Sequence, residues 1–327
     1  MLKTTRNETG VSQSPDVARI DEQFAEIAYR ELSILADVSE LSFATLLEMR
    51  FRFRGALGRE LRRMVCYFPK RRCDQCSLVD TCAYGVLFHS DAGEAREVHP
   101  WLLAVRPHTT DDRYLWISIR LFGSYIEYVP FVYYSVVRAS QKGVARRVGF
   151  GIERVLVDRC HTESDDEQLT LPHETSRLKL SLETARPTTH ELVFRTRAPV
   201  RVKGKGKYLG SLNMQELWIA AARRAERMVR LYGSGMPAQS QIAWQHPPAA
   251  ERECAEFEWL EAPYRSRPQA TTLRLGGVVG ELRATVVLTH FQRDVLNSVN
   301  VLHLGKNTTF GLGDARVELG ALSNIQS

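Results

Sequence analysis

Residues 305–313, near the end of the chain, combine residue types that hold phosphate groups. The segment reads GKNTTFGLG, with three glycines, two threonines, an asparagine and a lysine. Glycines let backbone N–H groups approach a phosphate closely, hydroxyl groups add donors, and lysine supplies charge. It lacks the G-x-x-x-x-G-K-[ST] pattern of a Walker loop. The segment predicts a polyanion-binding loop, and the alternative is a tight connection between two strands. The expected contacts are Gly305, Lys306, Asn307, Thr308, Thr309, Gly311 and Gly313.

Two other segments concentrate positive charge. Residues 50–72 contain nine basic residues and only one acidic residue, and residues 195–207 contain six basic residues and no acidic one. A run of charge is most often a solvated surface. Two such runs together with the glycine-rich segment favour binding of a polyanion such as RNA. The expected contacts are Arg52, Arg54, Lys203, Lys205 and Lys207.

Four of the six cysteines fall within 17 residues, in the spacing C-x6-C-x2-C-x5-C. Four thiolates close together can form a tetrahedral structural zinc site, which has no open position for catalysis. An iron–sulfur cluster also takes four thiolates but fits the spacing less well, and reduced, unliganded cysteines are the remaining alternative. The predicted zinc ligands are Cys66, Cys73, Cys76 and Cys82.

The nine histidines form no metal-binding motif of the H-E-x-x-H type. His303 precedes the glycine-rich segment by two residues, and His89 closes the cysteine segment. A lone histidine is more often structural than catalytic. Imidazole is nevertheless the apt general acid–base group near neutral pH, so both positions are candidates for chemistry on RNA.

The length of 327 residues is typical of two domains, and the net charge of +6 is a modest excess. Residues 1–17 are polar and predict a disordered tail. We expect an N-terminal domain over 18–183, with a cysteine-rich insertion at about 66–90, and a C-terminal domain over 184–327. No apolar stretch reaches the length of a membrane helix, so the expected location is the cytoplasm.

Each half of the sequence predicts strands, a helix and further strands, which is typical of an α+β, ferredoxin-like unit. Alternating apolar residues at 49–54 predict a strand or extended loop. A helix is predicted over 213–233, because Asn213 and Glu216 form a capping-box pattern and Gly233 is a stop signal. A strand pair is predicted around 271–288.

Four blocks, taken in order, resemble the CRISPR repeat-processing RAMP endoribonucleases of the Cas-six family. Arg54–Gly58 (RGALG) resembles the glycine turn of the first domain. Cys73-x2-Cys76-Ser77-Leu78 with Cys82-Ala83-Tyr84 resembles the cysteine-rich segment of one branch. Tyr264-Arg265-Ser266-Arg267 followed by residues 275–280 resembles the run before the C-terminal motif, and Leu302–Gly313 resembles that glycine-rich motif itself.

The resemblance implies two tandem ferredoxin-like (RRM-like) domains and cleavage of the repeat in precursor CRISPR RNA. The ribose 2′-OH beside the scissile phosphate would attack in line, leaving a 2′,3′-cyclic phosphate and a 5′-OH. No catalytic metal is required, because the nucleophile belongs to the substrate. The expected partners are the precursor repeat RNA and subunits of a CRISPR effector complex. Arg265 and Arg267 are further expected RNA contacts.

The catalytic residue departs from the family pattern. Many members place a catalytic histidine in or just after the first helix, whereas residues 41–88 contain no histidine. We therefore take His303 or His89 as the general acid or base, with Tyr84 or Lys306 stabilising charge on the phosphorane. Two alternatives stay open: a non-catalytic RAMP subunit that caps guide RNA, and a zinc-stabilised nucleic-acid-binding regulator.

Overall fold

The structure is a computed structural model. It describes residues 24–42, 45–89, 98–144, 148–161, 169–181, 187–234, 246–266 and 271–321. The predicted tail at 1–17 and the predicted domain boundary at 183–184 lie outside these residues. Within them, no helix has both the length and the apolar character needed to cross a membrane.

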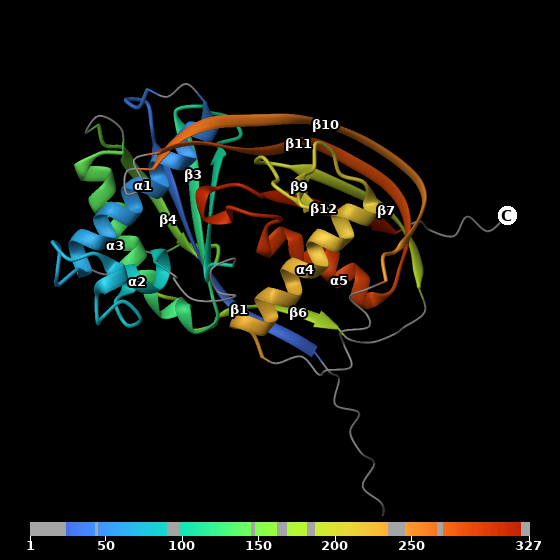
Figure 1. Cartoon of the computed structure of the whole chain (residues 1–327), viewed down its shortest axis with the longest axis horizontal. Coiled ribbons are helices and arrows are strands. Elements are labelled where there is room, and N and C mark those ends of the chain that lie inside the picture. Colours follow the sequence, from blue (N-terminus) through green and yellow to red (C-terminus); the bar gives the residue numbers. More distant parts are fainter. Residues whose placement is uncertain are drawn as a thin grey trace, which may run out of the picture.

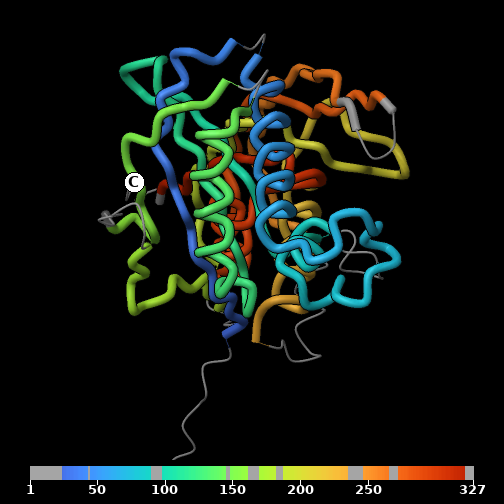
Figure 2. Tube along the Cα trace, turned by 90° about the vertical axis from the view of Figure 1, so that its left-hand side faces the viewer, coloured from blue at the N-terminus to red at the C-terminus, as the bar shows by residue number. Residues whose placement is uncertain are grey.

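The N-terminal half folds as a ferredoxin-like β-α-β-β-α-β unit. Its strands are β1 (Phe24–Asp37), β2 (Trp101–Pro107), β3 (Tyr114–Phe122), β4 (Gly151–Val157), β5 (Cys160–His161) and β6 (Ser176–Ser181). Its helices are α1 (Leu46–Val65), α2 (Ala83–Phe88) and α3 (Val129–Lys142), with 3-10 turns η1 (Cys73–Gln75) and η3 (Gly123–Tyr128). The sheet runs β2-β3-β1-β4-β5, with β6 also paired to β1, and every pair is antiparallel. Helices α1 and α3 lie side by side on one face of this sheet (Figure 2).

The C-terminal half repeats the same order of elements. Its strands are β7 (Thr188–Thr196), β8 (Lys203–Gly204), β9 (Lys207–Tyr208), β10 (Ala249–Ser266), β11 (Thr271–Leu288) and β12 (Ala315–Ala321). Its helices are α4 (Met214–Tyr232) and α5 (His290–Leu302), with a 3-10 turn η5 (Thr308–Phe310). The sheet order β10-β11-β7-β12 matches β2-β3-β1-β4 of the first half. The predicted α+β fold with two tandem ferredoxin-like domains is therefore confirmed.

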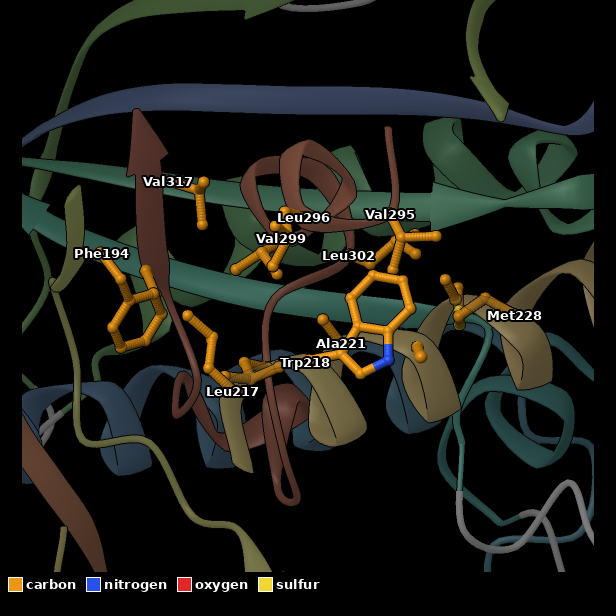
Figure 3. Close-up of a cluster of buried hydrophobic side chains, with 14 of the residues drawn as sticks. Phe194, Leu217, Trp218, Ala221, Met228, Val295, Leu296, Val299, Leu302 and Val317 are labelled. Carbon is orange, nitrogen blue, oxygen red and sulfur yellow. The ribbon is translucent and has the colours of Figure 1, made fainter. Parts of the chain in front are cut away.

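Helix α4 forms as its capping residues predict. The Asn213 side chain accepts a hydrogen bond from the Glu216 backbone N–H, and the Glu216 carboxylate accepts one from the Asn213 N–H. Trp218 and Met228 from the inner face of this helix pack with α5 and β7 in the largest apolar cluster (Figure 3). That cluster also contains Ile27 of β1, so the two halves share a core.

Two predicted elements were wrong. Residues 49–54 lie in α1, and the RGALG block is helical too, so it is no turn. The alternation arises because α1 buries two faces: Met49 and Phe53 enter the N-terminal core, while Leu47 and Phe51 contact the C-terminal half. Residues 271–288 form the single strand β11, not a strand pair.

The β10–β11 hairpin connects the two halves at a distance from their main interface. It arches from the C-terminal sheet to the start of α1 (Figure 1). There Ala262 and Leu275 pack against Leu47, Phe51 and Leu312. The hairpin thus brings Pro263 and Tyr264 of β10 to the exposed side of α1, where the basic residues of 50–72 begin.

Candidate functional site

The glycine-rich segment 305–313 lies between the two halves, with Thr308, Thr309 and residues 311–313 buried and residues 305–307 and Phe310 half-exposed. Its hydroxyl-bearing residues Thr308 and Thr309 are buried, and the Thr308 Oγ1 accepts a hydrogen bond from the Arg224 guanidinium (3.3 Å). The Lys306 backbone N–H donates to the Arg201 carbonyl (2.9 Å), and Asn307 begins the η5 turn in a left-handed conformation. Much of the segment thus contacts protein, and its predicted contacts to RNA stay a prediction.

The glycines of this segment are needed because protein atoms approach them closely. A Cβ on Gly311 would lie 2.9 Å from the Arg50 Cδ of α1, and a Cβ on Gly313 would overlap the Leu304 carbonyl oxygen. Gly305, Gly311 and Gly313 all have positive φ angles, which glycine adopts without strain. The segment therefore packs closely against α1 and joins it to the C-terminal half.

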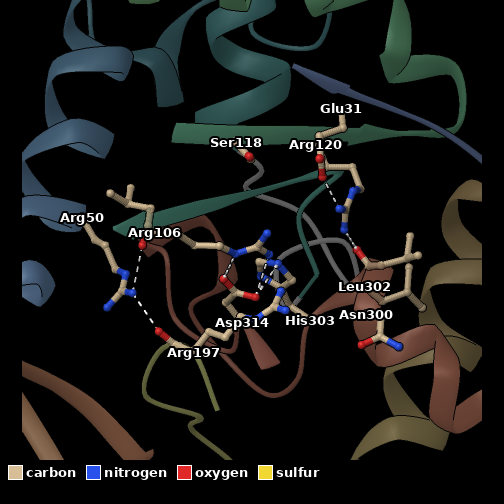
Figure 4. A network of polar contacts seen from close by, with 12 residues as sticks. Glu31, Arg50, Arg106, Ser118, Arg120, Arg197, Asn300, Leu302, His303 and Asp314 are labelled. Carbon is tan, nitrogen blue, oxygen red and sulfur yellow. Dashed lines mark hydrogen bonds and ion pairs between the residues drawn. The ribbon is translucent and has the colours of Figure 1, made fainter. Parts of the chain in front are cut away.

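Polar contacts lock this interface (Figure 4). The Arg106 guanidinium of β2 donates two hydrogen bonds to the Asp314 carboxylate, at 2.6 and 2.9 Å. Arg50 donates to the carbonyl oxygens of Val105 and Arg197, both at 2.9 Å. A buried, bidentate pair of this kind fixes geometry strongly, so the two halves hold one relative position.

His303 belongs to this interface and is only 1% exposed. Its Nε2 lies 3.7 Å from the Asp314 carboxylate. Burial lowers the pKa of His303 to about 3, with Asp314 opposing that shift and nearby arginines adding to it. The imidazole is therefore neutral at physiological pH and closed to solvent. RNA cannot reach it in this arrangement, so we do not include His303 in the candidate site.

An open pocket of about 1170 Å³ lies over the exposed side of α1. Glu48 is the one carboxylate among the described residues that line it, and five arginines of α1 line it too: Arg52, Arg54, Arg59, Arg62 and Arg63. Strand β10 supplies Pro263 and Tyr264, and the cysteine segment supplies Cys66, Pro69, Tyr84 and Phe88. Both halves of the chain thus contribute to one basic, aromatic-walled pocket.

Two arginines of this pocket have no carboxylate partner among the described residues: Arg62, which donates to backbone carbonyl oxygens, and Arg54. Arg54 forms no hydrogen bond or ion pair with any residue that the structure describes, and its Nε is buried without a partner. Its guanidinium lies 3.9 Å from the centroid of the Phe310 ring and 5.3 Å from that of Phe88. Burial lowers the pKa of Arg54 below its usual value. A desolvated guanidinium held between two rings is a strong site for an anion.

The other arginines of the pocket have protein partners. Arg52 pairs with Glu48 at 2.5 Å, and Arg59 and Arg63 both pair with the buried Glu60 carboxylate, at 2.8 and 2.9 Å. Glu60 therefore offsets part of the positive charge on this face. Arg54 is left as the side chain best prepared to bind a phosphate.

Gly55 leaves the backbone of α1 open at the pocket. No atom outside its immediate neighbours lies within 4 Å of where its Cβ would be. A mid-helix glycine costs about 0.5–1 kcal/mol relative to alanine. Protein packing does not require this one, in contrast to Gly311. The open backbone allows a ligand to lie directly against α1.

Tyr84 also lines the pocket. Its ring stacks on Phe88 at 5.4 Å between centroids, with the planes 2° apart. Burial raises the pKa of Tyr84, so its hydroxyl stays protonated and can donate a hydrogen bond. His89 is the residue at which α2 ends, next to Phe88, and does not line the pocket. The sequence therefore placed Tyr84 at the site and His89 beside it.

Sequence reasoning missed Phe310 and His99. Phe310 was not among the predicted contacts of the glycine-rich segment, yet the centroid of its ring lies 3.9 Å from the Arg54 guanidinium. His99 lies close enough to Arg54 for their charges to interact. Burial first, and then Arg54 and Arg224, lower its pKa to about 4. No pattern in the sequence marks either residue, because both act across the interface between the two halves.

Lys203, Lys205 and Lys207 are exposed on the β8–β9 hairpin, as predicted. Lys203 lies over the Tyr208 ring, with its Nζ 5.0 Å from the centroid. The hairpin and the cysteine segment project on the same side of the molecule (Figure 2). Arg265 is the next-to-last residue of β10 and follows the pocket residue Tyr264, and Arg267 lies outside the described residues.

The four cysteines predicted to bind zinc are free and half-exposed. The Cys73 thiol is close enough to Cys66, Cys76 and Cys82 to feel their charge, and burial raises its pKa. Among the described residues, however, no three or more cysteine, histidine or acidic side chains are arranged to hold a metal ion. The structure therefore gives the zinc prediction no support, and it stays a prediction.

Comparison with known proteins gives two family matches. Residues 194–315 match the CRISPR-associated endoribonuclease Cas6, and residues 51–181 match a family described only as an N-terminal domain. An uncharacterized protein of Archaeoglobus fulgidus is 24% identical over 277 residues, covering 81% of this chain and 90% of that protein.

Among solved structures, this chain is similar to Thermus thermophilus Cas6. The TM-score is 0.49 and the identity 14%, with 89% of this chain and 99% of that one covered. A Cas6 product complex gives a TM-score of 0.49 and 13% identity, covering 90% of this chain and all of that one. The family match over residues 194–315 confirms the resemblance carried by the glycine-rich motif: this part of the chain matches the family of the CRISPR-associated endoribonuclease Cas6.

Proposed function

We propose that this chain cleaves the repeat of precursor CRISPR RNA in the pocket over α1. The observation that carries the proposal is Arg54, a desolvated cation that no described residue neutralises, in a pocket built by both halves of a chain that matches an endoribonuclease family over residues 194–315. A phosphodiester is the anion that RNA brings, and guanidinium groups bind phosphate oxygens in a bidentate manner.

In the proposed reaction the ribose 2′-OH attacks the adjacent phosphorus in line. The 2′-oxygen–phosphorus bond forms and the bond to the 5′-oxygen breaks, giving a 2′,3′-cyclic phosphate and a 5′-OH. Negative charge grows on the non-bridging oxygens of the phosphorane. Arg54 stabilises that charge in a site from which water is partly excluded, and the Tyr84 hydroxyl donates a further hydrogen bond. The reaction needs no metal, because the substrate supplies the nucleophile.

Proton transfer requires a base for the 2′-OH and an acid for the leaving 5′-oxygen. His89, next to the pocket residue Phe88, remains our candidate from the sequence. His99 joins it, because it lies near Arg54 and its lowered pKa leaves it neutral, in the form that accepts a proton. Substituting each histidine by alanine in turn should separate them, since loss of the acting base slows cleavage while RNA affinity stays.

A non-catalytic subunit that binds and caps guide RNA is the second candidate function. One observation favours it: none of the described residues that line the pocket is a histidine. The same basic, aromatic pocket would serve binding alone. In that case the protein would be an RNA-binding member of the same family that assembles with other CRISPR effector subunits.

Labelled repeat RNA incubated with the purified protein in EDTA distinguishes the two functions. Cleavage at a single position, with a cyclic phosphate on the 5′ fragment, supports the metal-independent endoribonuclease. Tight binding without cleavage supports the capping subunit. An unrelated RNA of equal length and charge serves as the control, and equal affinity for both RNAs would contradict both proposals.

We also propose that Cys66, Cys73, Cys76 and Cys82 bind one structural zinc ion on a small rearrangement of the segment. Metal analysis of protein purified without chelator should return near one zinc per chain, and less for Cys73→Ser. A zinc content near zero in the wild type would remove this proposal and leave the cleavage proposal intact.

A further inference from the structure

The segment Tyr67–Arg72, between α1 and η1, exposes aromatic and basic side chains next to the pocket. It reads YFPKRR, and we call it the YFPKRR tip. The Tyr67 side chain is 85% exposed and that of Phe68 43% exposed. Single exposed apolar residues are common on protein surfaces, but two neighbouring rings followed by three cations are a specific combination.

The tip is held in place although its side chains are exposed. The Arg62 guanidinium of α1 donates hydrogen bonds to the carbonyl oxygens of Pro69 and Arg71, at 3.3 and 3.2 Å. The Arg71 backbone N–H closes a turn on the Phe68 carbonyl at 2.9 Å. A turn fixed in this way presents its rings with less loss of conformational entropy on binding than a flexible loop would.

Two of the three basic side chains of the tip are available to bind a ligand. Arg72 pairs with Asp74 at 2.7 Å, whereas Lys70 and Arg71 have no ion-pair partner among the residues that the structure describes. The Arg71 guanidinium lies 5.1 Å from the centroid of the Phe68 ring. The two free cations therefore stand beside the exposed rings and could contact a phosphate while a base stacks on a ring.

The tip continues the pocket without a break. Pro69 of the tip lines the pocket, as do Cys66 and Arg62 next to it. An RNA strand whose phosphate lies at Arg54 would therefore pass the tip within one or a few nucleotides. The exposed Trp259 offers a contrast, because its neighbours Glu258 and Glu261 would repel a phosphate backbone.

We propose that the YFPKRR tip binds the single-stranded RNA that adjoins the cleaved phosphodiester. Unpaired bases stack on Tyr67 and Phe68, and Lys70 and Arg71 contact the phosphates between them. Single-stranded RNA fits better than a duplex, because bases inside a duplex do not expose their faces to side chains. This inference rests on the proposed function, since it places the scissile phosphate in the pocket.

The test compares two RNAs that carry a 2′-deoxy sugar at the cleavage site, so that binding is measured without cleavage. One contains the repeat alone and the other adds an unpaired flank of about six nucleotides. The wild type should bind the flanked RNA more tightly, by roughly 5- to 150-fold for each base stacked on a ring. Tyr67→Leu with Phe68→Leu, which keeps apolar surface but removes both rings, should lose that gain.

Phe131→Leu is the matched control, because the Phe131 side chain is also 43% exposed but lies on α3. It should keep the flank-dependent gain. Lys70→Gln with Arg71→Gln should lower the slope of log affinity against log salt by about 1.4, as expected for two lost contacts to a single strand.

A Tyr67→Leu, Phe68→Leu protein that keeps the full gain would overturn the proposal, and so would an equal loss in Phe131→Leu. Failure of the cleavage proposal looks different, because the wild type would then leave ordinary repeat RNA uncut while flank-dependent binding remained measurable.

Discussion

The glycine-rich segment 305–313 and the exposed side of α1 around Gly55 look alike in sequence but differ in the structure. Both combine glycine with basic residues. In the first, protein atoms fill the space that glycine leaves, whereas beside Gly55 that space is empty. Glycine leaves room for a close neighbour in both places. In the glycine-rich segment other parts of the protein occupy that room, whereas beside Gly55 it opens into the pocket. Whether the glycine is buried decides between a structural role and a binding role, and the local sequence does not show whether it is buried.

The two regions also depend on each other. The glycine-rich segment holds Phe310 where its ring meets the Arg54 guanidinium. It therefore serves the candidate site indirectly, because Phe310 contacts the side chain that we propose binds the phosphate. The predictions below separate the structural role of the buried segment from the binding role of the open one.

The largest expected effect concerns the buried interface. Asp314→Asn should lower the free energy of unfolding by about 3–5 kcal/mol, because it leaves the Arg106 guanidinium without its bidentate partner. Urea denaturation measures the change. Glu318→Gln, which breaks the exposed pair with Arg316, is the control and should cost less than about 1 kcal/mol. Similar losses in both variants would deny the interface its special role.

The open side of α1 should show its effect in activity. Arg54→Gln should slow cleavage of repeat RNA by roughly 10²–10³-fold, the usual result of removing one donor to developing charge. Its folding stability should change little, because no described residue pairs with Arg54. Arg52→Gln is the matched control, since Arg52 is already paired with Glu48. Single-turnover cleavage rates are measured for both variants. Equal slowing by Arg54→Gln and Arg52→Gln would show only a general role of positive charge.

Alanine substitutions at the glycines should have smaller effects on stability, with opposite signs in the two regions. Gly313→Ala should destabilise the fold by about 2–3 kcal/mol, because a Cβ there meets the Leu304 carbonyl at positive φ. Gly55→Ala should instead stabilise it by about 0.5–1 kcal/mol, since the helix gains a better former in open space. Thermal unfolding of the two variants shows the sign directly, and destabilisation by both would mean that the space over Gly55 is not free.

The smallest expected effect is a dependence of stability on pH. The folded-state pKa of His303 is lowered to about 3, so the unfolded chain binds more protons as pH falls below about 6.5. Stability should therefore fall on acidification, by about 1 kcal/mol from this residue between pH 7 and pH 5.5. His303→Gln should lose that part of the slope. Urea titrations at the two pH values measure it, and an unchanged slope would show that the pKa of His303 is the same in the folded and the unfolded chain.

Much of the fold was predictable from local signals. The capping residues Asn213 and Glu216 predicted α4 because a helix end is specified by its own side chains. The extended prediction at 49–54 failed because α1 is buried on two faces, and the second face exists only once the C-terminal half packs on it. The candidate site shows the same division: Arg54 and Tyr84 were identified by type and position, whereas Phe310 joins them from about 250 residues away along the chain.

The account depends most on the claim that RNA occupies the pocket over Gly55. Gly55→Leu fills that space with a good helix former and should leave the fold at least as stable as the wild type. Repeat-RNA affinity and cleavage by Gly55→Leu, compared with Gly55→Ala at equal folded fraction, test the claim directly. We predict that the leucine variant loses both while the alanine variant keeps most of each. Wild-type binding and cleavage by Gly55→Leu would contradict the account and place the RNA elsewhere.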